Sequence, residues 1–365
     1  MILMNDFMAE PEALRMAELA AAERVLRSGW YVLGNEVKAF EAAWAERCST
    51  VYSVGVGNGM DAIEIGLRVL GIGPDDEVIT TPMTAFATVL AILRAGATPV
   101  LADIDARTAL LDPASVERCI SPRTKAILLV HLYGQVREMG HWTAFCDRHG
   151  IALLEDCAQS HLARWDGRVG GSFGRFGAYS FYPTKNLGAL GDGGAIVMDD
   201  AALAQRAAVL RNYGQSVRYH HPELGLNSRL DELQAALLLV RLKWLESFTE
   251  RRLQIAAAYH AGIASSSVQL LAAPSQAHSH VYHLFVVLCE QRDRLAQHLK
   301  AQGVETLAHY PVPVHFQAPC KDMRRDSHGL AVAERHAAQC LSIPCHPQMS
   351  DSNVTHVIDA INAFN

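Results

Sequence analysis

An aspartate and a lysine, each placed just after an apolar run, are the first candidates for chemistry in this chain of 365 residues. Asp156 follows residues 151–154, and Lys185 follows residues 178–181 within a stretch rich in glycine. Short apolar runs indicate buried strands, and α/β proteins place ligands at the carboxyl ends of such strands. A carboxylate is costly there without a cationic partner, which favours function over packing. Surface lysines are common, so a lysine alone does not indicate a function. Lys185, however, lies in no predicted helix or run of charged residues, and the nearby glycines allow the backbone to approach a ligand.

A glycine-rich turn is the third candidate. Gly55, Gly57 and Gly59 lie between a short apolar run and the helical pattern at residues 62–70. Backbone N–H groups at a helix N-terminus form an anion cradle when no β-carbons stand in the way. The turn alone could equally serve tight packing. Met60 breaks the G-x-G-x-x-G spacing of a dinucleotide site, and the chain has no G-x-x-x-x-G-K-[ST] phosphate loop.

An anion cradle, a strand-end aspartate and a strand-end lysine are together what pyridoxal 5′-phosphate requires. The cradle takes the phosphate, the carboxylate keeps the pyridine nitrogen protonated so that the ring is an electron sink, and the lysine forms the Schiff base. The three candidates therefore predict a pyridoxal-phosphate site. A nicotinamide dehydrogenase is disfavoured, because the glycine spacing is wrong and no acidic residue follows about 20 positions on at a second strand end.

The run around the lysine, Ser180-Phe-Tyr-Pro-Thr-Lys-Asn-Leu-Gly-Ala-Leu-Gly-Asp-Gly-Gly194, resembles the lysine signature of the nucleotide-sugar aminotransferases. These are pyridoxal-phosphate enzymes of fold type I, of the DegT/DnrJ/StrS type. The resemblance covers essentially the whole chain, through residues 28–34, 57–62, 131–135, 155–159, 211–214, 225–235, 309–315 and 341–347. The combination is specific, although no one of these motifs would be.

The resemblance implies a role for each matching position at the cofactor. Lys185 matches the Schiff-base lysine, Asp156 the partner of the pyridine nitrogen, and Gln159 the contact to the phenolic oxygen. Gly59, Met60 and Ser180 match the phosphate cradle.

Further matches concern the partner subunit and the substrate. Asn227 matches an asparagine that reaches the phosphate of the neighbouring subunit's cofactor, which implies a homodimer with shared active sites. Five residues match positions near the sugar or its nucleotide: Tyr31, Tyr182, His309, Tyr310 and His315.

One position departs from the family pattern. Many members carry an aromatic ring, in a Thr-Phe or Thr-Tyr pair, that stacks on the pyridine ring, whereas here Ala85 follows Thr84. Either Phe86 or another ring takes that place, or this protein stacks little on its cofactor.

The resemblance implies a transamination in two stages. L-Glutamate displaces Lys185, the freed amine acts as general base, and a keto sugar linked to a nucleoside diphosphate then takes the amino group. Lys185 must be neutral for this, and both desolvation and the nearby protonated ring lower a lysine's pKa. The lysine argues against the family's dehydratases, which carry histidine at this position.

The substrate is indicated by residues 309–315 and 212–214, which most resemble members acting on dTDP-linked 3-keto-6-deoxyhexoses. Such enzymes serve the biosynthesis of amino sugars for O-antigens, other glycans or antibiotics. The alternatives are 4-keto sugars and UDP- or GDP-linked sugars. A non-catalytic regulator that binds pyridoxal phosphate is a further alternative, which the complete set of Lys185, Asp156 and Gln159 disfavours.

The elements that must position these residues are visible in the hydrophobic pattern. Seven short runs alternate with helical segments at residues 52–54, 77–80, 98–102, 126–130, 152–154, 178–181 and 195–198, as expected of a sheet buried on both faces. Two helices are predicted before residue 50, and one long amphipathic helix over residues 230–248. With the resemblance, we expect an aspartate aminotransferase-like fold with a mixed seven-stranded sheet: a large α/β domain at 1–245 and a small α+β domain at 246–365.

Composition excludes several other classes. Half of the chain is apolar, 19% is charged and the net charge is −6, so neither disorder nor a polyanion partner is expected. The uncharged stretch at 78–93 is shorter than the roughly 20 residues of a spanning helix. The start has no signal-peptide pattern, and the eight cysteines include no C-x-x-C, so we expect a soluble cytoplasmic protein with reduced thiols. His278, His280 and His283 have no acidic or cysteine partner at ligand spacing, so no metal is predicted.

Overall fold

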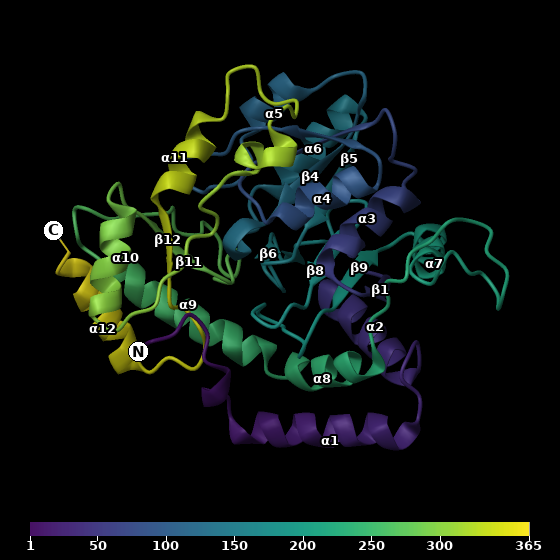
Figure 1. The fold of residues 1–365 in the computed structure, drawn as a ribbon, viewed down its shortest axis with the longest axis horizontal. Helices are drawn as coiled ribbons and strands as arrows, with labels where there is room; N and C mark the ends of the chain where they lie inside the picture. Colours follow the sequence, from purple (N-terminus) through teal and green to yellow (C-terminus); the bar gives the residue numbers. More distant parts are fainter. Residues whose placement is uncertain (365) are drawn as a thin grey trace.

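The computed structural model describes residues 1–364, which form an α/β part beside a smaller C-terminal part (Figure 1). The α/β part is built on a seven-stranded sheet with the order β1-β9-β8-β5-β4-β2-β3. All neighbours are parallel except β9, which is antiparallel to both β1 and β8. The strands are β1 (Tyr52–Val56), β2 (Glu77–Thr80), β3 (Thr98–Leu101), β4 (Thr124–Val130), β5 (Ala152–Asp156), β8 (Gly177–Ser180) and β9 (Gly194–Met198). All seven predicted strands and the mixed sheet are therefore confirmed.

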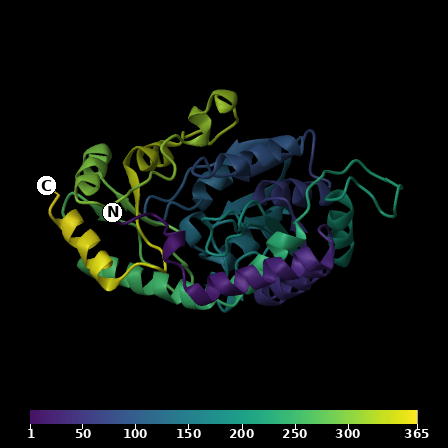
Figure 2. The same ribbon diagram turned by 60° about the horizontal axis from the view of Figure 1, so that its bottom comes forward.

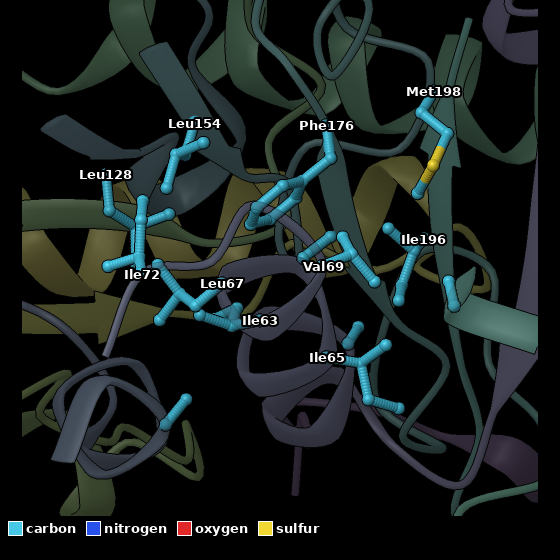
Figure 3. Close-up of a cluster of buried hydrophobic side chains, with 14 of the residues drawn as sticks. Ile63, Ile65, Leu67, Val69, Ile72, Leu128, Leu154, Phe176, Ile196 and Met198 are labelled. Carbon is cyan, nitrogen blue, oxygen red and sulfur yellow. The ribbon is translucent and has the colours of Figure 1, made fainter. Parts of the chain in front are cut away.

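Successive residues of the central strands enter different cores, which is why these strands are apolar throughout. On β4, Leu128 packs beneath α3 (Gly59–Val69), α4 (Phe86–Arg94) and α7 (Ala201–Leu210), whereas Ile127 packs toward α5 (Pro113–Cys119) and α6 (Met139–His149). Figure 3 shows the first of these clusters, in which Ile63 and Leu67 of α3 face the sheet. The sheet is thus buried on both faces, as predicted.

The N-terminal helices and the helix expected at residues 230–248 lie along one side of the sheet. The first two are α1 (Glu12–Ser28) and α2 (Asn35–Cys48), as predicted, and α1 lies along the outside of α8 in both views (Figures 1 and 2). The single long helix is wrong: the chain forms α8 (Glu232–Leu242) and α9 (Leu245–Gly262), with a break at Lys243 and Trp244. The two halves serve different cores, since α8 packs with α2 whereas α9 packs in the C-terminal part.

The C-terminal part has a three-stranded antiparallel sheet in the order β10 (Gln269–Leu270), β11 (Phe285–Leu288), β12 (Cys340–Ile343). Its helices are α9, α10 (Arg292–Ala301), α11 (Ala331–Gln339) and α12 (Asp351–Asn362). These strands and helices give the C-terminal part the α+β character that was expected. Ile2 pairs with Val304, so the first residues of the chain join this part. The domain division at residue 245 stays a prediction.

Two further features concern the chain as a whole. All eight cysteines are buried free thiols. Across residues 1–364, no helix combines the length and the apolarity that crossing a membrane requires.

Candidate active site

Lys185 and Asp156 come together because β5 and β8 are adjacent and parallel. Asp156 ends β5 opposite Ala178 of β8, and Lys185 follows β8 in the loop at its carboxyl end. Burial lowers the pKa of Lys185 to about 8, and the negative charge of Asp156 opposes that shift. Near physiological pH, Lys185 is therefore a neutral amine far more often than an ordinary lysine, and the neutral amine is the form a nucleophile or general base needs.

The Asp156 carboxylate is 6% exposed and is held by two neutral donors. Thr88 Oγ1 donates to Oδ2 over 2.8 Å, and the backbone N–H of Ala158 donates to Oδ1 over 3.1 Å. Burial raises the pKa of Asp156, and these two hydrogen bonds and the Lys185 charge counteract it. Thr88 had no predicted role, although its spacing of four residues from Thr84 at the start of a helix was visible in the sequence.

The turn before α3 has the features of an anion cradle. Asn58 accepts from the N–H of Asp61, so the first-turn amides of Gly59 and Met60 are left for a ligand. A β-carbon at Gly59 would lie 2.6 Å from the β-carbon of Ser180, so only glycine allows the helix start to approach this serine. The predicted cradle residues Gly59 and Ser180 are thus neighbours, and unpaired amides at a helix start are the donors that bind a phosphate.

The side-chain amide of Gln159 has a fixed orientation. Its Oε1 accepts from the backbone N–H of Tyr133 over 2.6 Å, and its Nε2 donates to the hydroxyl of Tyr310 over 3.2 Å. The donor end of the amide therefore faces the side of the site where Tyr310 lies. Burial raises the pKa of Tyr310 to about 12, so its hydroxyl stays protonated. Tyr133 is a contact that no predicted role anticipated.

Three imidazoles, two of them buried and that of His309 half-buried, feel the Lys185 charge. The pKa of His161 falls to about 3 and that of His309 to about 4, through burial first and the Lys185 charge second. The pKa of His283 is also lowered, by burial and then by Lys185. His161 Nε2 donates to the Ser180 carbonyl over 3.0 Å, which ties this ring to the cradle. All three rings are neutral, so they add polar groups around Lys185 without adding charge; only His309 was predicted here.

Comparison with known proteins decides the family. Residues 12–362 match the profile of the DegT/DnrJ/EryC1/StrS aminotransferase family. The chain belongs to this family. A curated relative, dTDP-3-amino-3,4,6-trideoxy-alpha-D-glucose transaminase of Streptomyces venezuelae, is 46% identical over 98% of this chain and 95% of its own. UDP-N-acetyl-3-dehydro-alpha-D-glucosamine 3-aminotransferase of Acidithiobacillus ferrooxidans is 39% identical over 99% of this chain and 97% of its own.

Solved structures agree with this membership. The crystal structure of S. venezuelae DesV in complex with a ketimine intermediate matches with a TM-score of 0.95 and 46% identity, covering 99% of this chain and 97% of that one. NtdA of Bacillus subtilis with bound cofactor PMP matches with a TM-score of 0.89 and 29% identity, covering 97% of this chain and 82% of that one. The predictions of an aminotransferase, of its fold and of pyridoxal phosphate as the cofactor of the family are confirmed.

The predicted substrate residues of this aminotransferase are not all in one place. Tyr31 and Tyr182 are 53% and 52% exposed, whereas His309 and Tyr310 lie in the site beside Lys185 and Gln159. His315 is buried, and its Nε2 lies 3.0 Å from Glu334.

Two other predicted positions, His315 and Asn227, form no side-chain hydrogen bond to the groups around Lys185. The charged groups that shift the pKa of His315 are Glu334, Arg325 and Asp103, and Lys185 is not among them. Asn227 is exposed and pairs through its backbone with Asn212. The substrate role of His315 and the partner role of Asn227 stay predictions.

The segment that lacks the stacking ring lies at the start of α4. Ala85 is the N-cap residue of this helix. Phe86 packs against a buried cluster that includes Val89, Leu132 and Tyr133. Phe86 is half-buried, and its packing against this cluster disfavours it as a substitute for the missing stacking ring.

Within residues 1–364, His131, Glu155 and Cys157 are the one group of side chains close enough to share a metal ion. Glu155 Oε2 accepts from His131 Nε2 over 2.8 Å and from the N–H of Gly171 over 2.7 Å. Its Oε1 accepts from two more backbone N–H groups of the same loop, each over 2.8 Å. The carboxylate thus anchors the loop at residues 171–174, and these four hydrogen bonds account for the cluster.

Proposed function

We propose that this aminotransferase moves the amino group of L-glutamate to carbon three of a dTDP-linked 3-keto-6-deoxyhexose. The observation that carries the proposal is the pairing of Lys185 with Asp156 at adjacent strand ends, with the pKa of Lys185 at about 8. An amine whose pKa is lowered toward neutrality, next to a carboxylate that can hold a protonated ring nitrogen, is suited to proton transfer at a substrate carbon.

Each residue of the site has a task in this proposal. Pyridoxal phosphate supplies the electron sink when it is bound. Lys185 binds it covalently and, once released, removes and returns the proton at the reacting carbon. Asp156 would hold the proton of the ring nitrogen, and Gln159, whose Nε2 is its donor end, would donate to the phenolic oxygen.

The phosphate of the cofactor and the sugar of the substrate bind at the edges of the site. The amides of Gly59 and Met60, with Ser180, hold the phosphate. Tyr310 keeps its proton, and His309 stays neutral with its Nδ1 2.8 Å from Ser342 Oγ. Both are therefore suited to hydrogen bonding with an uncharged sugar, and we place the sugar there.

The relatives support amination at carbon three, and experiment must choose between dTDP and UDP as the nucleotide of the substrate. The S. venezuelae relative, whose name specifies a dTDP-3-amino sugar, is more similar to this chain than the A. ferrooxidans relative that acts on a UDP-linked sugar. A UDP-linked 3-keto sugar is thus the second candidate. Biosynthesis of amino sugars for O-antigens, other glycans or antibiotics, and a cytoplasmic location, stay predictions.

We further infer a homodimer whose two sites are shared. Asn227 is exposed and free to reach another chain, and large apolar side chains flank the Lys185 loop on the surface, Tyr182 and Leu190 among them. Exposed apolar surface of this kind is typical of an interface between subunits. Trp30, at 63% exposure, adds to it.

A substrate panel tests the proposal. Protein loaded with pyridoxal phosphate is incubated with L-glutamate and dTDP- or UDP-linked 3-keto and 4-keto sugars, and the position of the new amine is read by mass spectrometry and NMR. We expect amine at carbon three of the dTDP-linked sugar, 2-oxoglutarate as co-product, and neither with Lys185→Ala. Preference for the UDP-linked sugar would select the second candidate. Amine at carbon four, or no bleaching of the yellow protein by glutamate, would overturn the proposal.

A further inference from the structure

Two threonine hydroxyls and the Asp156 carboxylate form a buried chain of hydrogen bonds. Thr84 Oγ1 lies 2.7 Å from Thr88 Oγ1, and Thr88 Oγ1 lies 2.8 Å from Asp156 Oδ2. The three residues are 5%, 1% and 6% exposed. An ionised carboxylate only accepts hydrogen bonds. The Thr88 hydroxyl therefore donates a hydrogen bond to Asp156, and the Thr84 hydroxyl donates one to Thr88. Both hydrogen bonds are therefore donated in the same direction, toward Asp156.

The local structure fixes both hydroxyls. Thr88 lies in the first turn of α4, where its own N–H donates to the carbonyl of Ala85. Thr84 precedes the helix by two residues, so the spacing of four places its hydroxyl beside that of Thr88. A β-branched side chain in a helix has few accessible rotamers, so the Thr88 hydroxyl is held at the carboxylate without much loss of freedom.

The charges around Asp156 show why these neutral donors matter. The positive charge of Lys185 favours its ionised form, and the imidazole of His131, the hydroxyl of Tyr310 and the thiol of Cys157 also face it. Among the ion pairs of residues 1–364, none includes Asp156. When Lys185 is engaged with the cofactor it no longer offers a free ammonium group. The Thr88 hydroxyl and the Ala158 N–H then remain as fixed donors to the carboxylate.

We propose that Thr88, backed by Thr84, is a positioning residue that keeps Asp156 ionised and aimed at the ring nitrogen of pyridoxal phosphate. The proposal rests on the proposed function. Hydrogen bonds in a chain strengthen one another in a site of low dielectric, so Thr84 adds to the effect of Thr88. Position 85 is alanine and supplies no aromatic ring to stack on the pyridine ring. The hydrogen bond from the ring nitrogen to Asp156 therefore contributes more to holding the cofactor ring.

The test uses full-length protein loaded with pyridoxal phosphate that carries ¹⁵N in the ring. The ¹⁵N chemical shift reports the ring proton as the pH is raised, independently of turnover. Thr88→Val keeps the shape but removes the donor that fixes the carboxylate in place. A carboxylate that is no longer aimed at the ring nitrogen stabilises its proton less, so we expect this proton to be lost about one pH unit lower, a tenfold change. Thr84→Val should shift it in the same direction by less, and Thr88→Ser should restore the wild-type titration.

Steady-state rates give a second reading. Thr88→Val should lower kcat about tenfold and leave KM for the sugar nucleotide unchanged, because only the step that uses the electron sink is affected. Thr143→Val is the matched control, since the Thr143 hydroxyl bonds only to the carbonyls of Met139 and Gly140 in its own helix. It should titrate and turn over as wild type.

The possible outcomes separate the two proposals. If Thr88→Val keeps the ring proton over the wild-type pH range, Thr88 has no positioning role, although the proposed function stands. If wild-type protein binds no pyridoxal phosphate, the proposed function itself fails. If Thr88→Val does not fold, Thr84→Val decides. Loss of the ring proton at the wild-type pH would overturn the proposed role of the two threonines, and loss at lower pH would support it.

Discussion

The backbone N–H of Tyr133 donates to Oε1 of Gln159 over 2.6 Å, and this bond determines which end of the amide faces the site. Tyr133 is itself tied to the C-terminal part, because its hydroxyl donates to the His309 carbonyl over 2.5 Å and lies 2.9 Å from His336 Nε2. The orientation of a cofactor-facing amide on the sheet thus depends on contacts with the C-terminal part.

Gln159→Glu should bind pyridoxal phosphate more weakly. The new carboxylate can still accept from Tyr133, but it cannot donate to Tyr310 or to the phenolic oxygen of the cofactor. Loss of a hydrogen bond to a charged oxygen costs about 1.5–3 kcal/mol, so the dissociation constant should rise about tenfold or more. Titration of apo-protein by absorbance measures it, with the exposed Gln205→Glu as control. An unchanged dissociation constant would show that this amide does not contact the cofactor.

Covalent attachment of the cofactor should titrate near pH 8. Burial lowers the pKa of Lys185 from an ordinary 10.5 to about 8, so the rate should be half-maximal at about pH 8 and level off at higher pH. Asp156→Asn removes the negative charge that raises this pKa, and the midpoint should move below 8. Stopped-flow absorbance after mixing apo-protein with pyridoxal phosphate provides the profile. A midpoint near 10.5 would contradict the buried setting of Lys185, and the exposed Lys125→Ala should not move it.

Gly59→Ala should disturb the phosphate cradle. Its β-carbon would lie 2.6 Å from Ser180 Cβ and 3.1 Å from Ser180 Cα, so the helix start and the serine must separate. We expect the affinity for pyridoxal phosphate to fall about tenfold, because the amides of the first turn no longer converge on the phosphate. Gly140→Ala in α6 is the control, since a β-carbon there meets nothing within 4 Å. Equal affinities of the two variants would argue against a cradle at Gly59.

The site could be predicted from sequence where the sheet alone determines position. Asp156 and Lys185 follow apolar runs, and adjacent parallel strands necessarily bring such residues to one edge. Thr88 and Tyr133 could not be predicted in the same way. Thr88 is 68 residues from Asp156 and Tyr133 is 26 from Gln159, so those contacts depend on how α4 and the loop after β4 pack.

The error over residues 230–248 has a related cause. The apolar pattern continues across Lys243 and Trp244, but α8 packs in the core around α2, whereas α9 from Leu253 onward packs in the core of the C-terminal part. Periodicity shows that a residue is buried, and it does not show against which part of the molecule. The same holds for His161 and His283, whose burial beside Lys185 depends on tertiary packing.

Glu232→Ala should destabilise the fold. This buried carboxylate lies in the first turn of α8 and caps the start of α2, accepting from the N–H groups of Gly34, Glu36 and Val37 over 2.8–2.9 Å. Removing it leaves these donors without their charged acceptor, so we expect a loss of about 3 kcal/mol in the free energy of unfolding. Urea denaturation measures it. The exposed Glu250→Ala should change stability little, and similar values for both variants would refute the cap.

Mixed dimers test whether Asn227 serves the partner's site. Lys185→Ala removes the covalent lysine, and Asn227→Asp places a like charge where the resemblance puts the phosphate, so each homodimer should have little activity. If Asn227 acts across the interface, a mixed dimer has one site with both changes and one intact site. Activity should then appear when the two variants are unfolded and refolded together. If Asn227 acts within its own subunit, each site carries one change and mixing restores nothing, which would remove the shared site from the proposed function.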